Sequence, residues 1–111
     1  MDFTTPIPTI RPTRYSVSLL PEHNVNHHVY EVTVEDRGAD RWAVCWMGDC
    51  LAADGTWDRE PRPSIRDDDW LDTHRFTLAT ALKLAEEAAP HVTVNGITAS
   101  QVLAHAQESA S

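Results

Sequence analysis

The chain has 111 residues, the length of one domain, and its hydrophobic fraction of 41% and charged fraction of 23% are those of an ordinary folded globular protein. The formal net charge of −8 disfavours general binding to the phosphates of DNA or RNA and fits a partner with a basic or mixed surface. No apolar stretch has the length of a membrane span, and Met1 to Pro6 lack the basic region and apolar run of a signal peptide, so we expect a cytoplasmic protein.

Residues 1–13 contain Pro6, Pro8 and Pro12 with little periodicity, which predicts an extended N-terminal arm. A single α+β domain is expected over residues 14–106, followed by a frayed tail at residues 107–111. The first half of the domain predicts an antiparallel β-meander of three to five strands. The second half predicts one main α-helix, which packs against the sheet, and a short C-terminal helix.

Strands are predicted at residues 14–20, 29–34 and 41–47, where apolar, β-branched and aromatic residues recur. The third strand is apolar on both faces, so it is expected to be central and covered on both sides. One face holds Trp42, Val44 and Trp46, and the other holds Ala43, Cys45 and Met47. Asp54-Gly55 is a strong hairpin signal, after which Trp57 begins a return strand.

The main helix is predicted over residues 77–89, where small and leucine side chains form a stripe. The residues of the stripe are Leu78, Ala81, Leu82, Leu84, Ala85, Ala88 and Ala89. Before it, Ser64 is expected to cap a short helix, with Asp67 three residues later. After it, Val92 to Val94 predict a short strand that turns at Asn95-Gly96. The run Thr98–Gln101 is a capping box, and the helix it begins is expected to end near Ala106.

The segment 57–70 is the strongest candidate for a binding site. It holds two tryptophans, three arginines, two prolines and five acids, which predicts a stiffened surface loop with the residue types of binding hot spots. The candidate binding residues are Trp57, Arg59, Arg62, Arg66, Asp68 and Trp70. The two tryptophans have an alternative interpretation, in which each is buried and anchors one end of the loop.

Metal binding and catalysis are not predicted. His23, His27 and His28 could supply zinc ligands together with Cys45 or Cys50, but no pair has the tight spacing of a structural zinc site. The two cysteines are expected to be thiols. Residues 67–69 are three consecutive aspartates, which are better explained as the first turn of a helix than as a cation site. Phosphate-loop and nucleophile motifs are missing, so we expect no cofactor and no enzymatic activity.

Two resemblances bear on function. The layout over residues 28–89, a strand meander followed by His74-Arg75-Phe76-Thr77 and an Ala/Leu helix, resembles the arm-binding domain of phage integrases, which implies DNA binding by the sheet. However, residues 31–60 hold eight acids and three bases, and phosphate would repel them. The run 75–90 and the later Val94-Asn95-Gly96 resemble small Arg- and Trp-rich proteins of phages of actinobacteria, which implies an accessory protein that acts on host machinery.

The leading hypothesis is therefore a non-enzymatic protein-binding accessory module, phage or prophage encoded, which acts on a host cytoplasmic protein. One alternative is a nucleic-acid-binding domain that uses a local cluster of Arg59, Arg62, Arg66 and Arg75. Another is an acidic mimic of DNA. Formation of a homo-oligomer stays open.

Overall fold

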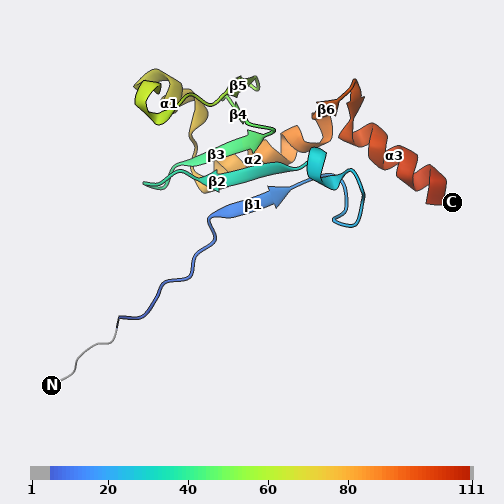
Figure 1. Ribbon diagram of the computed structural model, residues 1–111, viewed down its shortest axis with the longest axis horizontal. Coiled ribbons are helices and arrows are strands. Elements are labelled where there is room, and N and C mark those ends of the chain that lie inside the picture. The colour runs from blue at the N-terminus through green and yellow to red at the C-terminus, as the bar shows by residue number, and fades with distance from the viewer. Residues whose placement is uncertain (1–5, 111) are drawn as a thin grey trace.

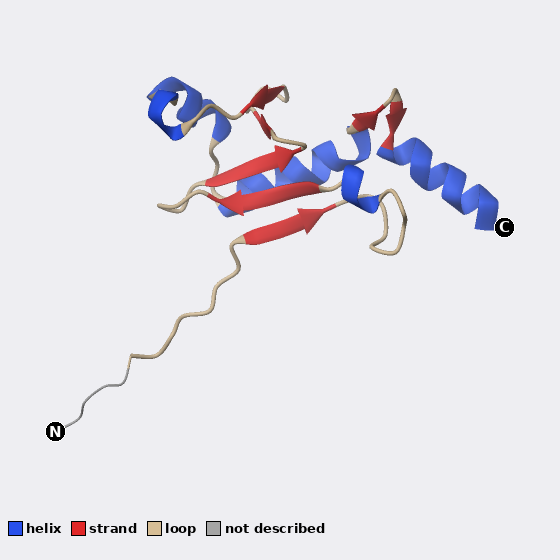
Figure 2. Cartoon of the chain, in the orientation of Figure 1, coloured by secondary structure: helices blue, strands red, loops and turns tan. Residues whose placement is uncertain are grey.

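The computed structural model describes residues 6–110 and has the expected α+β fold (Figures 1 and 2). Five antiparallel strands form one sheet in chain order, as a meander. They are β1 (Arg14–Val17), β2 (Val32–Asp36), β3 (Trp42–Trp46), β4 (Asp49–Leu51) and β5 (Trp57–Arg59). A small second sheet pairs β6 (Thr93–Val94) with β7 (Ile97–Thr98). The predicted meander is confirmed, and its five strands are the largest number in the predicted range of three to five.

Three α-helices follow the first sheet: α1 (Asp68–His74), α2 (Leu78–Ala88) and α3 (Ala99–Ala110). Short 3-10 helices are η1 (His27–Val29), η2 (Pro63–Ile65) and η3 (Ala89–His91). Helix α2 lies across one face of the sheet, whereas α3 projects away from it (Figure 1). Residues 6–13 are an exposed segment without regular structure, and residues 1–5 of the predicted arm lie outside the described part. Within residues 6–110, no helix is long and apolar enough to cross a membrane.

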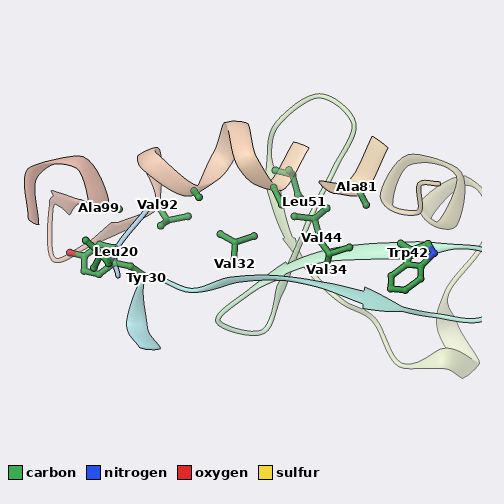
Figure 3. Close-up of a cluster of buried hydrophobic side chains, with 12 residues drawn as sticks. Leu20, Tyr30, Val32, Val34, Trp42, Val44, Leu51, Ala81, Val92 and Ala99 are labelled. Atoms are coloured by element: carbon green, nitrogen blue, oxygen red, sulfur yellow. The ribbon is translucent and has the colours of Figure 1, made fainter. Parts of the chain in front are cut away.

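The core lies between α2 and one face of the sheet (Figure 3). Val32, Val34 and Val44 are fully buried there, opposite Ala81 and Ala85. The alanines allow the helix backbone to come close to the sheet. The three leucines of the predicted stripe are only half-buried and pack around this centre. The stripe is therefore confirmed, with its small residues at the middle.

The second strand begins three positions later than the sequence predicts. Residues 27–29 form η1, in which the backbone hydrogen bonds join near neighbours instead of another strand. The Tyr30 amide, for example, donates to the His27 carbonyl. The Tyr30 hydroxyl donates to the Ile97 carbonyl at 2.8 Å, so its side chain ties this segment to β7. Strand pairing then starts at Val32, which lies opposite Val17 of β1. Local turn formation and this side-chain contact outweigh the β propensity of residues 29–31.

The third strand ends in a tight turn instead of continuing through Met47. Met47 and Gly48 both have positive φ, 48° and 85°, between the paired residues Trp46 and Asp49. This is the backbone of a two-residue hairpin turn, for which glycine and asparagine are the preferred residues. Met47 is 62% exposed, and Cys45 is half-buried. On the face that holds Ala43, Cys45 and Met47, only Ala43 is buried. The expectation that both faces of this strand are covered is therefore wrong for the part that follows Ala43.

The helix ends also differ in detail from the prediction. Asp67, and not Ser64, caps α1, because its carboxylate accepts a hydrogen bond from the Trp70 amide at 2.7 Å while Ser64 lies inside η2. The capping box of α3 is confirmed: the Thr98 amide donates to the Gln101 side chain and the Gln101 amide donates to the Thr98 hydroxyl. Helix α3 continues to Ala110, since no glycine or proline follows Ala106 to stop it. The predicted frayed tail is thus helical at residues 107–110, and Ser111 lies outside the described residues.

Candidate binding cleft on the open face of the sheet

The segment 57–70 is held to the domain at both ends by its tryptophans. Trp57 in β5 is half-buried, with its ring centroid 5.8 Å from that of Trp46. Trp70 in α1 is also half-buried and stacks on the His74 ring, with centroids 4.1 Å apart and planes 2° from parallel. The Arg75 guanidinium lies 5.1 Å from the Trp70 ring centroid, a cation–π geometry. Both tryptophans thus act as anchors, although each keeps part of its surface exposed.

The other four predicted binding residues fall into two groups. Arg59, Arg62 and Asp68 are exposed, and Asp68 lies in the first turn of α1. Arg66 is half-buried, and its guanidinium donates to the Pro61 carbonyl at 2.9 Å. Arg66 therefore stabilises the loop from within, whereas the side chains of the first group are exposed to solvent.

Glu60 is the electrostatic centre of this segment. Its carboxylate accepts hydrogen bonds from Arg75 at 2.6 Å and from Arg37 at 3.1 and 3.2 Å, and Arg66 lies 3.7 Å away. The role of Glu60 is not evident from the sequence, because Arg37 lies 23 residues before it and Arg75 lies 15 residues after it. Burial alone would raise the pKa of Glu60, but the hydrogen bonds and charges of Arg37 and Arg75 outweigh it and lower that pKa. Glu60 is thus ionised and fixed in place.

A second contact joins β5 to α1. The Nε2 atom of His74 lies 2.8 Å from an Asp58 carboxylate oxygen, and its Nδ1 atom lies 2.7 Å from the Trp70 carbonyl oxygen. His74 is buried. Together with Glu60–Arg75, this contact fixes the position of the strand relative to the helix.

A polar cleft of about 310 Å³ opens on the face of the sheet opposite α2. It arises from strand alternation: Val32, Val34 and Val44 point to the core, so Thr33, Glu35 and Cys45 point to the other face. The lining residues are Arg14, His28, Glu31, Thr33, Glu35, Arg37, Cys45, Trp46, Met47, Gly48, Asp49 and Glu60. The alternating polar positions Glu31, Thr33 and Glu35 were the sequence signal for this face.

The ion pairs of the cleft differ in strength between its centre and its rim. At the centre, Arg37 is bonded to Glu60 and also to Glu35, at 3.2 Å. Burial would raise the pKa of Glu35, but hydrogen bonds from Thr33 and Arg37 lower it overall.

At the rim, Arg14 lies 3.4 Å from Glu31, and Arg59 lies 3.4 Å from Asp49. These two arginine side chains are 59% and 79% exposed. Exposed pairs of this kind contribute about 0–1 kcal/mol, so the rim arginines can be displaced at small cost.

The histidine and cysteine side chains that could supply zinc ligands make other contacts. The Nδ1–H of His27 donates to the Leu20 carbonyl oxygen at 3.0 Å, and its Nε2 atom lies 3.7 Å from Glu31, while Cys45 and Cys50 face each other across β3 and β4. Within residues 6–110, no group of three or more His, Cys, Asp or Glu side chains could hold a metal ion.

Comparison with protein-family models, with characterised proteins and with solved structures finds no match for this chain.

Proposed function

We propose that the chain is a non-enzymatic protein-binding module whose cleft receives a basic side chain of a partner protein. The observation that carries the proposal is the combination of Glu31 and Asp49, each with a weak and exposed arginine partner, at the rim of one cleft. A lysine or arginine of the partner can replace Arg14 or Arg59 there with little loss. The net charge of −8 also attracts a basic surface over long range.

The cleft has an apolar wall that suits the stem of such a side chain. Trp46 and Met47 line it beside the carboxylates. Lysine and arginine bury their methylene stems on apolar surface while the charged end reaches polar groups. The size of the cleft fits one such side chain at the lower end of ordinary ligand pockets.

The backbone of Met47 gives further support. A methionine in the left-handed region is unfavourable compared with glycine or asparagine, and this one is exposed. Strained residues cluster at functional sites, because selection retains them for contacts and not for stability. We interpret Met47 as a contact residue at the cleft.

The arginines of the nucleic-acid alternative are divided between two roles. The Arg75 side chain is 2% exposed and Arg66 is half-buried, and both guanidinium groups form ion pairs with the Glu60 carboxylate. Only Arg59 and Arg62 remain exposed, beside a cleft with four carboxylates. This arrangement favours a protein partner over phosphate. In the alternative in which the chain mimics DNA, the exposed aspartates of α1 would provide the negative charges, and the cleft would not be the binding site.

The resemblance to phage accessory proteins leads us to propose a host protein in the cytoplasm as the partner. The test is capture from an actinobacterial lysate with the immobilised chain and with three double variants of equal net charge. Glu31→Gln/Asp49→Asn alters the cleft, Asp69→Asn/Asp72→Asn alters α1, and Glu86→Gln/Glu87→Gln is the control on the exposed side of α2. We expect only the cleft variant to lose the captured protein.

Two outcomes would contradict this proposal. Loss in the α1 variant alone would favour the DNA mimic. Micromolar, salt-sensitive binding of a fluorescent random duplex that requires Arg59 and Arg62 would favour the nucleic-acid alternative.

A further inference from the structure

The two cysteines of the chain form a directly opposed pair on neighbouring strands. Cys45 of β3 pairs with Cys50 of β4, and their Sγ atoms are 3.9 Å apart. The preceding pair, Trp46 and Asp49, closes the two-residue turn. Ladder pairs alternate, so Cys45 and Cys50 occupy a non-hydrogen-bonded pair, where Cα atoms are about 4.5 Å apart. That separation lies within the range that disulfides require.

The two sulfur atoms differ in access. Cys45 lines the polar cleft and is half-buried, whereas Cys50 is only 1% exposed. A reagent in solution therefore reaches the Cys45 sulfur first. Cys50 can then react only with its neighbour, across a distance that a small side-chain rotation closes.

The surroundings favour a thiolate at Cys50 and not at Cys45. The hydrogen bond from the Cys45 thiol lowers the pKa of Cys50, against the opposing effects of burial and of Glu60, and Arg75 adds to the lowering. The same contact raises the pKa of Cys45. Arg37 donates to the Cys45 sulfur at 3.6 Å. The buried sulfur is thus the one better able to act as a nucleophile toward its neighbour.

We propose that Cys45 and Cys50 are a reversible redox pair that closes to an intramolecular disulfide on reaction with a low-molecular-weight disulfide such as oxidised glutathione. In the first step, the Cys45 thiol is deprotonated and its thiolate attacks one sulfur of oxidised glutathione. A mixed disulfide forms, and one glutathione leaves with the proton that Cys45 loses. In the second step, the Cys50 thiolate attacks the Cys45 sulfur and releases the second glutathione as a thiolate, which takes a proton from solvent. The protein loses two electrons and two protons, and one oxidised glutathione becomes two reduced molecules.

The disulfide would join β3 to the outer part of the sheet. Strands β4 and β5 have three residues each, and β5 leads directly to Glu60. A covalent link at this point limits the opening of the hairpin in the unfolded chain. We expect the melting temperature to rise by on the order of 5 °C on oxidation.

The test uses the purified full chain in buffers of defined ratio of reduced to oxidised glutathione. We expect the intact mass to fall by two hydrogen atoms in oxidising buffer and to recover in reducing buffer. Tryptic peptides should place the link within the fragment between Arg41 and Arg59. A chain that keeps both thiols, retains glutathione on Cys45 without closing, or forms linked dimers would overturn the proposal.

Single variants test the order of the two steps. Cys50→Ser should accumulate a mixed disulfide at Cys45, because the second nucleophile is gone. Cys45→Ser should remain unmodified, because Cys50 is buried. Faster modification of Cys50 than of Cys45 would contradict the order. If either variant fails to fold, rapid acid quenching of the wild type still decides, since the transient glutathione adduct should lie on Cys45.

Discussion

Arg75 donates a 2.6 Å hydrogen bond to Glu60, although the Arg75 side chain is only 2% exposed. This pair joins the end of β5 to the end of α1 and forms the rear of the ionic network behind the cleft. Because a buried guanidinium needs a carboxylate partner, the network fixes the position of the segment 57–70. The exposed residues of that segment are presented from a rigid base.

Removal of Glu60 should therefore destabilise the domain. Glu60→Ala leaves Arg75 buried without its carboxylate and is expected to lower the free energy of unfolding by about 3 kcal/mol, as for other broken buried pairs. Glu87→Ala, an exposed acid on α2, is the control and should change it by less than about 0.5 kcal/mol. Urea unfolding measures both. Equal effects would mean that Glu60 is not a structural centre.

The same network predicts how stability depends on pH. The pKa values of Glu35 and Glu60 are lowered in the folded state from the ordinary value of 4.5. Their contribution is therefore fully present above that value and is lost as the pH falls through the lower folded pKa values. Urea unfolding across pH about 6 to 3 should show this loss, with a smaller slope for Glu60→Gln than for wild type. An unchanged slope in the variant would contradict the assignment.

The small residues of α2 give a packing prediction. Ala85 is fully buried against the sheet, so Ala85→Leu should overfill the core and lower the free energy of unfolding by about 1–3 kcal/mol. Lys83→Leu adds a similar side chain on the exposed side and serves as the control. Thermal unfolding of the two variants compares them. A neutral Ala85→Leu would place the helix farther from the sheet than described.

The fold was largely predictable because its signals are local. Alternation over β3, the alanine and leucine stripe of α2 and the capping box of α3 each occupy a few neighbouring residues. Most of the candidate site was not predictable, because it depends on contacts between distant segments. Glu60 meets Arg37 and Arg75 because the fold brings three distant segments together. For Trp57 and Trp70, the sequence left open whether they are contact residues or buried anchors of the loop ends. In the structure both are half-buried anchors, whereas Arg59 and Arg62 are exposed.

Met47 offers a test of function against stability. Met47→Asn suits the positive φ of the turn and should raise the free energy of unfolding by about 0.5–1 kcal/mol. If Met47 contacts the partner, as proposed, the same variant should bind the captured protein more weakly. Unfolding and binding are measured on the same preparation. A stabilised variant with unchanged affinity would remove Met47 from the site.

In the proposed complex, carboxylates at the rim of the cleft take the partner's cation in place of the protein's own arginines. The most direct measurement is the dissociation constant of the captured partner, by calorimetry, for Asp49→Asn and for Arg59→Ala. We expect opposite effects: Asp49→Asn weakens binding by about tenfold, whereas Arg59→Ala strengthens it, because Asp49 no longer has a competing cation. Weaker binding in both variants would make Arg59 a contact residue in its own right and would rule out the proposed exchange of cations at Asp49.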